Sequence, residues 1–168
     1  MIKNIILRKL LPKYHAKKIG VEFGRDCNFI NVSWGSEPYM IALGNNVTLS
    51  NVSFNTHDGS CRIIRDKFPN IDLIEPISIG SNVFIGTNTI ILPGVTIKDN
   101  IIVGAGSVVT KKMYEGDSVY AGNPARKICT LAEWTRKNEK RFERTKGMTF
   151  EEKKKFYREK YRDSRVTE

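Results

Sequence analysis

The sequence predicts an all-β solenoid with a protruding loop and a short helical C-terminal extension. Three observations predict the solenoid. Apolar residues recur every six positions through the middle of the chain, and glycine or asparagine recurs between them. A period of six also matches neither the 3.6-residue turn of an α-helix nor a heptad. Such a pattern is typical of short strands joined by tight bends and stacked coil upon coil.

The clearest repeat comprises five hexads in register, over residues 79–108: "IGSNVF", "IGTNTI", "ILPGVT", "IKDNII" and "VGAGSV". The first positions are all β-branched and apolar: Ile79, Ile85, Ile91, Ile97 and Val103. We expect each to begin a strand and to point inward. Glycine at the second position, as in Gly80 and Gly86, suits a corner that needs positive φ or a close backbone approach.

The same period is weaker upstream, in "FGRDCN" from Phe23 and in "LGNNVT" and "LSNVSF" over residues 43–54. It lapses over residues 55–78, which contain "NTHDGS" and "RIIRDKFPN". The solenoid is therefore expected to carry one long excursion with His57 at its base. Because a solenoid has no cleft of its own, such an excursion is where a site would be built.

The two ends of the chain carry its basic character. Residues 1–30 hold seven Lys or Arg against two Asp or Glu, residues 31–110 four against six, and residues 111–168 seventeen against ten. In residues 1–18, the spacing of Ile2, Ile5, Ile6 and Leu10 predicts a short amphipathic helix. A helix that caps the core is one interpretation, and a peripheral membrane-surface anchor is the other. The apolar run is too short for a membrane span, and without a small-residue cleavage site the segment is not expected to be a signal peptide.

Two short helices are predicted over residues 129–168. Thr130 with Glu133, and Thr149 with Glu152, have capping-box spacing. Aromatic and leucine side chains give each helix an apolar stripe, which we expect to pack against the solenoid or a neighbouring subunit. Stacking on nucleic acid is the less favoured use of these stripes, and no nucleic-acid partner is expected.

The cysteines indicate a reducing environment. Cys27, Cys61 and Cys129 are an odd number, widely spaced, with no C-x-x-C pair. Neither a disulfide framework nor a zinc ribbon is indicated, and a cytoplasmic location is expected.

The motifs "VGAGSVVTK" and "AGNPA", together with the hexads, resemble a known family over residues 19–128. The sequence is similar to the left-handed parallel β-helix acetyltransferases of the hexapeptide-repeat superfamily. The similarity is to the branch with galactoside, maltose and capsular-polysaccharide O-acetyltransferases. Left-handedness is implied by this resemblance alone, since crossover statistics favour the opposite hand.

The resemblance implies a homotrimer with active sites between subunits, acetyl-CoA in the groove, and a histidine base that follows a "VTL" hexad. In "NNVTLSNVSFNTHDG" that histidine is His57. A histidine suits this role because an imidazole can remove the acceptor proton near neutral pH. Asp58 is a candidate for orienting it, with a turn-forming role as the alternative. Asn31 and Asn55 are candidates for binding an acceptor sugar, or for turn roles.

The resemblance also implies residues that hold acetyl-CoA. Gly86 is a candidate oxyanion donor through its backbone N–H. The others lie toward the pantetheine arm or the phosphates: Thr87, Ala105, Thr110, Lys111 and Arg126. Two positions depart from the family pattern. Phe84 replaces a tryptophan that helps to line the site, and Cys129 stands where galactoside-type members carry an arginine.

The function implied is acetyl-CoA-dependent O-acetylation of a sugar hydroxyl, in surface-polysaccharide or glycolipid synthesis. Amino-sugar N-acetylation is the alternative, followed by a non-catalytic scaffold whose basic ends bind an acidic polymer or a membrane. A thiolate mechanism through Cys61 is a competing route for the transfer. No metal is expected, because related zinc enzymes need three histidine ligands and this chain has only His15 and His57.

Overall fold

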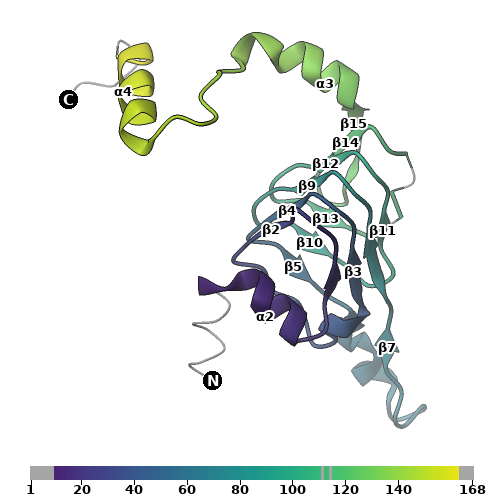
Figure 1. The fold of residues 1–168 in the computed structure, drawn as a ribbon. Helices are drawn as coiled ribbons and strands as arrows, with labels where there is room; N and C mark the ends of the chain where they lie inside the picture. Colours follow the sequence, from purple (N-terminus) through teal and green to yellow (C-terminus); the bar gives the residue numbers. More distant parts are fainter. Residues whose placement is uncertain (1–9, 111, 114, 163–168) are drawn as a thin grey trace, which may run out of the picture. The chain divides into compact units, whose positions relative to one another are not determined.

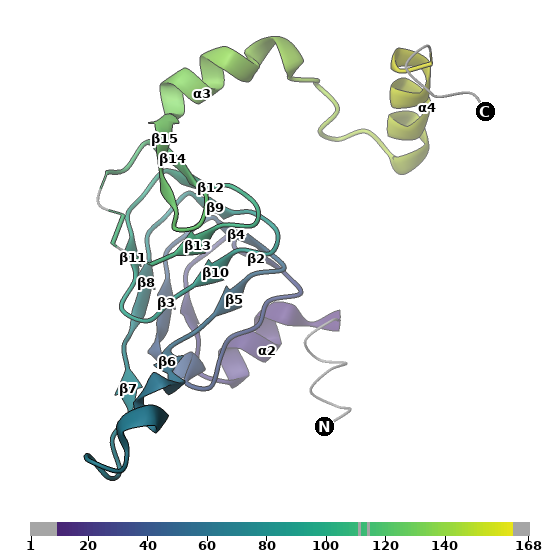
Figure 2. The same ribbon diagram turned by 180° about the vertical axis from the view of Figure 1, so that it is seen from behind.

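The structure is a computed structural model that describes residues 10–110, 112, 113 and 115–162. Its central part is a parallel β-helix in which successive strands pass from one sheet to the next around a common core (Figure 1). The sheets have the strand orders β1-β3-β8-β11, β13-β10-β5 and β15-β14-β12-β9-β4-β2, and Figure 2 shows the three-stranded sheet from its outer side. The predicted all-β solenoid is confirmed.

The strands are short, as the six-residue period requires. The four-stranded sheet contains β1 (Glu22–Phe23), β3 (Ile41–Leu43), β8 (Ile77–Ile79) and β11 (Thr96–Ile97). The three-stranded sheet contains β5 (Ser53–Phe54), β10 (Ile90–Ile91) and β13 (Val108–Val109). The six-stranded sheet contains β2 (Asn28–Ile30), β4 (Val47–Ser50), β9 (Val83–Ile85), β12 (Ile101–Val103), β14 (Ser118–Ala121) and β15 (Arg126–Thr130). Only the β14–β15 pair in these three sheets is antiparallel, and it ends the helix of coils.

The hexad side chains form the core. All five first-position residues are buried, and so are the fifth-position residues Val83, Thr89, Val95, Ile101 and Ser107. Like residues stack between coils, for example Leu49 on Ile85 and Ile85 on Val103. The expectation that the first-position residue begins a strand is wrong, because Ile79, Ile85 and Val103 each end one. The bend follows directly after this buried residue.

Asparagine and glycine occupy the corners of the coils, where the backbone needs positive φ or a close approach between coils. Asn46, Asn82 and Asn100 have φ of 54°, 56° and 59°, and their side chains hydrogen-bond in sequence from coil to coil. Asparagine tolerates this left-handed conformation better than most residues do. Gly86 instead permits close approach, since a Cβ there would lie 2.6 Å from the Ala105 nitrogen. Both roles considered for the hexad glycines are observed, since Gly94 and Gly106 have φ of 72° and 68°.

Helix α2 (Pro12–Lys18) covers the first coil, and proline at its first position fits the start of a helix. Ala16 is fully buried against the core, next to an aromatic group formed by Phe23, Phe29, Trp34 and Phe54. A cap on the core is thus confirmed for this segment. Ile2, Ile5 and Ile6, on which the helix prediction also rested, lie outside the described residues.

The chain forms two compact units, one through Thr135 and the other from Arg136. The two predicted C-terminal helices are present as α3 (Leu131–Asn138) and α4 (Phe150–Lys160), with a 3-10 turn η3 (Glu139–Arg141) between them. Both predicted capping pairs form, since Thr130 and Thr149 exchange hydrogen bonds with Glu133 and Glu152. In the part of the chain that the structure describes, no helix is both long and apolar enough to cross a membrane.

We expect Ile85→Ala to lower the free energy of unfolding by about 2–5 kcal/mol. Ile85 is fully buried between Leu49 and Val103 in adjacent coils, so its truncation leaves a cavity. Urea denaturation followed by circular dichroism measures the change. Ile90→Ala is the matched control, because Ile90 lies 37% exposed on β10, and a comparable loss in both variants would contradict the stacking argument.

Candidate active site

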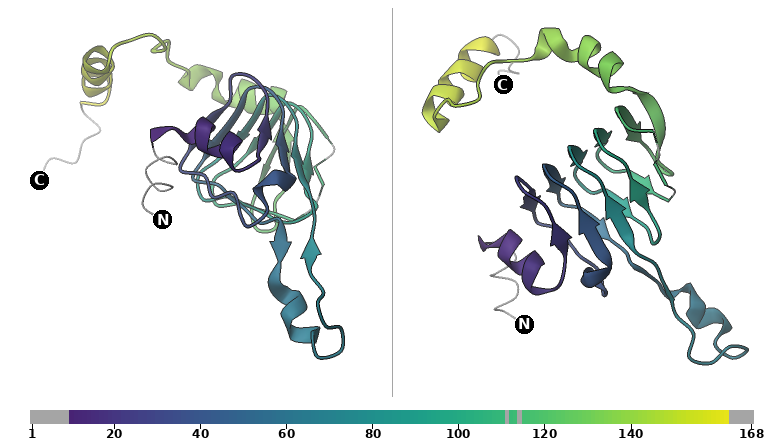
Figure 3. Two further views of the ribbon diagram at one scale, coloured as in Figure 1. Left: turned by 60° about the horizontal axis from the view of Figure 1, so that its bottom comes forward. Right: turned by 45° about the vertical axis from the view of Figure 1, so that its right-hand side comes forward.

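His57 lies at the base of the predicted excursion. Strand β6 (His57–Asp58) pairs in antiparallel register with β7 (Leu73–Ile74), with His57 opposite Ile74. Between them run the 3-10 helix η2 (Gly59–Ile64) and a loop that projects away from the β-helix (Figure 3). The imidazole is 30% exposed. The histidine is therefore held in a two-residue strand pair and is still reachable by a substrate.

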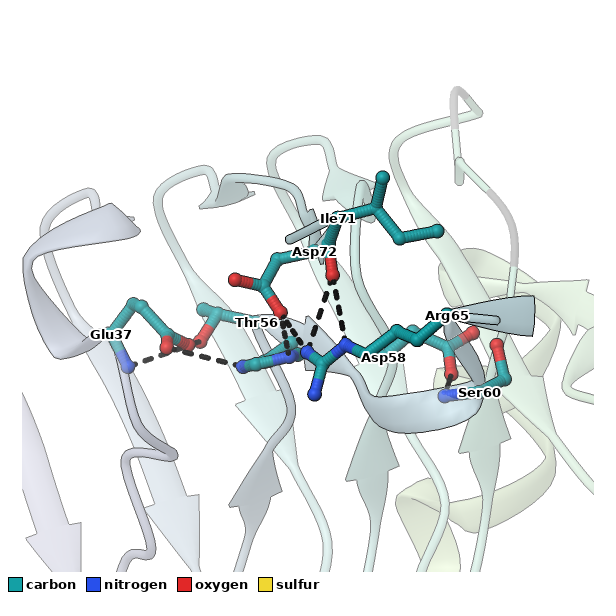
Figure 4. Close-up of polar contacts among 8 residues, drawn as sticks. Glu37, Thr56, Asp58, Ser60, Arg65, Ile71 and Asp72 are labelled. Atoms are coloured by element: carbon teal, nitrogen blue, oxygen red, sulfur yellow. Dashed lines mark hydrogen bonds and ion pairs between the residues drawn. The ribbon is translucent and has the colours of Figure 1, made fainter. Parts of the chain in front are cut away.

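Glu37 orients His57 from the preceding coil. It stands just before the 3-10 turn η1 (Pro38–Met40), and its Oε1 lies 3.3 Å from the imidazole Nδ1. Its other carboxylate oxygen accepts a hydrogen bond from the Thr56 hydroxyl at 2.8 Å, and Thr56 is fully buried (Figure 4). The Glu37 side chain is itself only 12% exposed. A carboxylate at Nδ1 favours the tautomer with a proton there and leaves the Nε2 lone pair free.

Glu37 was not among the predicted site residues, although a signal for it exists. Coils in this part of the chain are offset by 20 residues, as the pairing of Phe29 with Leu49 shows. The same offset separates the hexads that begin at Phe23 and Leu43, and it separates Glu37 from His57. The distance between two recognisable hexads thus points to the residue that stacks beside the histidine.

Asp58 does not orient His57 in this structure. Its Oδ1 accepts a hydrogen bond from the Ser60 backbone N–H at 2.9 Å and so caps η2. That hydrogen bond is the main cause that lowers the pKa of Asp58 below its usual value. Of the two roles considered for Asp58, the turn-forming contact is the one observed, and the carboxylate that contacts Nδ1 of His57 is that of Glu37.

Asp72 faces the other nitrogen of the imidazole. Its Oδ1 lies 3.6 Å from His57 Nε2 and 2.6 Å from Nη2 of Arg65. The Arg65 guanidinium also donates to the Ile71 carbonyl, at 3.2 and 3.3 Å, so it ties the two sides of the excursion together (Figure 4). These residues place one carboxylate and one guanidinium on the side where an acceptor must approach Nε2. Neither Asp72 nor Arg65 is among the residues predicted from the sequence.

The predicted acceptor residues lie at two different corners. Asn55 is exposed and directly precedes the Thr56–His57 pair, with its backbone N–H bonded to the Ile91 carbonyl at 2.8 Å. Asn31 has a φ of 51°, and its side chain donates to Asn51 in another corner ladder. Binding of a sugar by either residue stays a prediction.

Part of the predicted acetyl-CoA set lies along one edge of the β-helix. Thr87 and Ala105 are both exposed, and the Thr87 hydroxyl lies 3.1 Å from that of Ser50. Phe84 is 45% exposed on the six-stranded sheet, between Thr48 and Ile102. This sheet is a different face from the three-stranded sheet that His57 follows. Phe84 therefore lies on a different side of the β-helix from the histidine. Thr87 and Ala105 precede β10 and β13, whereas His57 follows β5 of the same three-stranded sheet, so within one chain they lie at opposite ends of these parallel strands.

The other residues predicted to hold acetyl-CoA lie at different places in the fold, and their contact with it stays a prediction. The proposed oxyanion role of Gly86 is not supported, because its N–H donates to the Val103 carbonyl at 2.9 Å in the coil ladder. Thr110 is exposed just after β13, and Arg126 is exposed at the start of β15, where it donates to the Ala125 carbonyl. Lys111 lies outside the described residues. Cys61, named for the thiolate route, lies within η2.

Comparisons with known proteins agree with this architecture. Residues 76–111 match the family described as the hexapeptide repeat of succinyl-transferase. The chain is 44% identical to Protein CapG of Staphylococcus aureus over 164 residues, or 95% of each chain. It is 55% identical to the galactoside O-acetyltransferase of Escherichia coli K12 over 53 residues, which are 32% of this chain and 26% of that relative.

Solved structures give the same result. The maltose O-acetyltransferase of Clostridium difficile 630 has a TM-score of 0.59 at 28% identity, over 76% of this chain and 82% of that one. A galactoside acetyltransferase in complex with coenzyme A has a TM-score of 0.51 at 25% identity, over 74% and 72% of the two chains. The expected left-handed parallel β-helix is confirmed by these neighbours. The chain belongs to the hexapeptide-repeat acetyltransferase family.

Proposed function

We propose that this protein transfers the acetyl group of acetyl-CoA to a sugar hydroxyl, with His57 as the general base. The observation that carries the proposal is the placement of the imidazole, which is 30% exposed and has the Glu37 carboxylate at Nδ1, with Asp72 3.6 Å from Nε2. The similarity to a maltose and a galactoside O-acetyltransferase supports a saccharide as the acceptor. The similarity to CapG along nearly the whole chain is consistent with a role in polysaccharide synthesis.

The proposed step uses the imidazole twice. Nε2 takes the proton from the acceptor hydroxyl while its oxygen attacks the thioester carbonyl, because a neutral alcohol is a weak nucleophile. Glu37 accepts a hydrogen bond from Nδ1–H and stabilises the imidazolium that forms. When the C–S bond breaks, the imidazolium returns the proton to the departing CoA sulfur. The oxygen–carbon bond formed thus replaces the sulfur–carbon bond lost, and His57 is regenerated.

We also infer that each site is completed by a second copy of the chain, as in the trimers that the sequence resemblance implies. The donor-side residues Thr87 and Ala105 precede strands of the three-stranded sheet, whereas His57 follows one, so within one chain they lie at opposite ends of these strands, which supports a shared site. Exposed hydroxyl and backbone groups along that edge suit the amides of a pantetheine arm. Acetyl-CoA would supply the thioester whose carbonyl the acceptor attacks.

Arg126→Gln is expected to raise KM for acetyl-CoA by about 10-fold, which corresponds to the loss of one charge-assisted hydrogen bond. Arg126 is exposed and is proposed to face the CoA phosphates. Steady-state kinetics with acetyl-CoA and with acetyl-pantetheine, which lacks the 3′-phosphate and the pyrophosphate, measure the effect. An equal rise in KM for both donors would contradict a phosphate contact.

An acetyl-transfer assay against nucleotide sugars and oligosaccharides tests the proposed function. The panel includes amino sugars, so that ester and amide products separate O-acetylation from N-acetylation. Calorimetry with CoA is the accompanying measurement. A protein that neither binds CoA nor acetylates any acceptor would be the scaffold named as the third alternative.

A further inference from the structure

Helix α2 has one face that packs on the β-helix and one that does not. Pro12, His15, Ala16 and Ile19 are buried or half-buried, and their spacing of three and four residues defines the packed face. The opposite face of α2, and the residues just before the helix, are exposed. Leu10, Leu11 and Tyr14 are 74%, 55% and 58% exposed. Exposed lysines lie beside them: Lys13, Lys17 and Lys18. Capping the core explains the first face only.

The charge around this face is of one sign. Residues 1–21 contain six Lys or Arg and no Asp or Glu, and Glu22 is the first acid. Exposed leucine and tyrosine beside lysine is the combination that suits the headgroup level of a bilayer. There the apolar side chains enter the acyl boundary, and the lysines pair with anionic headgroups.

Other occupants fit this face less well. A nucleic acid or acidic polymer would pair with the lysines and leave Leu10 and Leu11 in water. A second copy docked on the same face would bring two sets of lysines together without an acidic partner. The observations therefore favour a surface that is both anionic and apolar beneath its charges.

We propose that the exposed face of α2 binds the surface of an anionic lipid bilayer. The helix ends at Lys18. Gly20, two residues later, packs closely on Tyr39, since a Cβ at Gly20 would lie 2.9 Å from the Tyr39 Cβ. Tyr39 is two residues from Glu37, which contacts His57, and α2 lies at the same end of the β-helix as β6 (Figure 2). If the proposed function holds, on which this last step rests, the acceptor is a sugar attached to the membrane.

Vesicle co-sedimentation of the full-length protein tests lipid binding without reference to activity. We expect binding to vesicles of phosphatidylglycerol and phosphatidylcholine, and at least about 10-fold weaker binding to phosphatidylcholine alone. The triple variant Lys13→Gln, Lys17→Gln, Lys18→Gln is expected to lower the partition coefficient on the order of 100-fold. Absence of wild-type binding to the anionic vesicles would overturn the proposal.

A charge-matched control separates this face from overall charge. Lys146→Gln, Lys153→Gln, Lys155→Gln removes the same charge from exposed positions in the second compact unit. The proposal expects this control to keep most of the binding. An equal loss in both triple variants would show that net charge, rather than α2, drives the association and would overturn the proposal.

The apolar contribution has its own variant, Leu11→Ser, Tyr14→Ser. We expect it to weaken binding to anionic vesicles by about 10-fold or more, because the side chains that enter the acyl boundary are lost. Light scattering without vesicles reports the number of subunits. A change in that number, with vesicle binding unaltered, would assign the face to contacts between copies and overturn the proposal. Circular dichroism confirms that each variant is folded.

Discussion

Replacing His57 with alanine is expected to lower kcat for acetyl transfer by about 10²–10⁴-fold, the usual contribution of a positioned general base. The imidazole is the proposed acceptor of the hydroxyl proton, and no neighbouring group in the described site can replace it with the same geometry. Asp72 faces Nε2 but is held by Arg65. Initial rates with saturating acetyl-CoA and a confirmed acceptor measure the change.

The donor side should be unaffected by this substitution. CoA affinity of His57→Ala, measured by calorimetry, is expected to match that of the wild type, so that the loss is one of chemistry. Cys61→Ser is the paired control, because Cys61 lies in the neighbouring η2 and is the nucleophile of the competing acetyl-enzyme route. Full activity in Cys61→Ser excludes that route. Near-normal activity in His57→Ala, with activity lost in Cys61→Ser, would exclude the general base instead.

The β-helix could be predicted because its repeat fixes which side chains point inward. Every sixth residue lies in the same kind of environment, so the equivalent positions Ile79, Ile85 and Ile91 are all apolar and all buried. The prediction that the first residue of each hexad begins a strand was wrong. The period alone does not say whether the bend comes before or after this residue. Capping pairs such as Thr149 with Glu152 located the C-terminal helices because their hydrogen bonds are local.

The backbone conformation at the corners of the coils was predicted only in part, because glycine and asparagine can both occupy a corner but have different side chains. Glycine and asparagine both occur at bends, and the sequence left positive φ and close approach as alternatives for glycine. The structure gives positive φ to Gly94 and Gly106 and also to Asn82 and Asn100, whose amides bond from coil to coil, and it gives close approach to Gly86. An amide that bonds along the stack offers a stabilisation that glycine cannot give.

The candidate site shows where sequence reasoning reaches its limit. His57 was located by its place at the end of a hexad run and by family resemblance. Glu37 was within reach, because the hexads that start at Phe23 and Leu43 define the 20-residue offset that pairs it with His57. Asp72 could not be predicted from the sequence, since it lies beyond an irregular loop and no repeat fixes its distance from the histidine.

Substitutions at Glu37 are expected to produce the second large effect on catalysis. We expect Glu37→Ala to lower kcat by about 10²–10³-fold, because the carboxylate sets the tautomer of His57 and stabilises the imidazolium. Glu37→Gln separates geometry from charge. Its amide oxygen can still accept from Nδ1–H, while its NH₂ group can donate to the Thr56 hydroxyl oxygen, so the ring is held but the charge is lost. Its kcat is expected to fall between those of the wild type and Glu37→Ala.

Nitrogen NMR of the imidazole decides whether Glu37 acts through His57. The wild type and Glu37→Gln should show the proton on Nδ1, whereas Glu37→Ala should show a mixture of tautomers. Asp58→Asn is the matched control, because Asp58 is adjacent to the histidine but its carboxylate caps η2 through Ser60. If Asp58→Asn lost as much kcat as Glu37→Ala with the tautomer unchanged in both, the effect would come from the excursion as a whole. A loss confined to Glu37, with KM for the acceptor nearly constant, instead identifies it as the residue that positions the base.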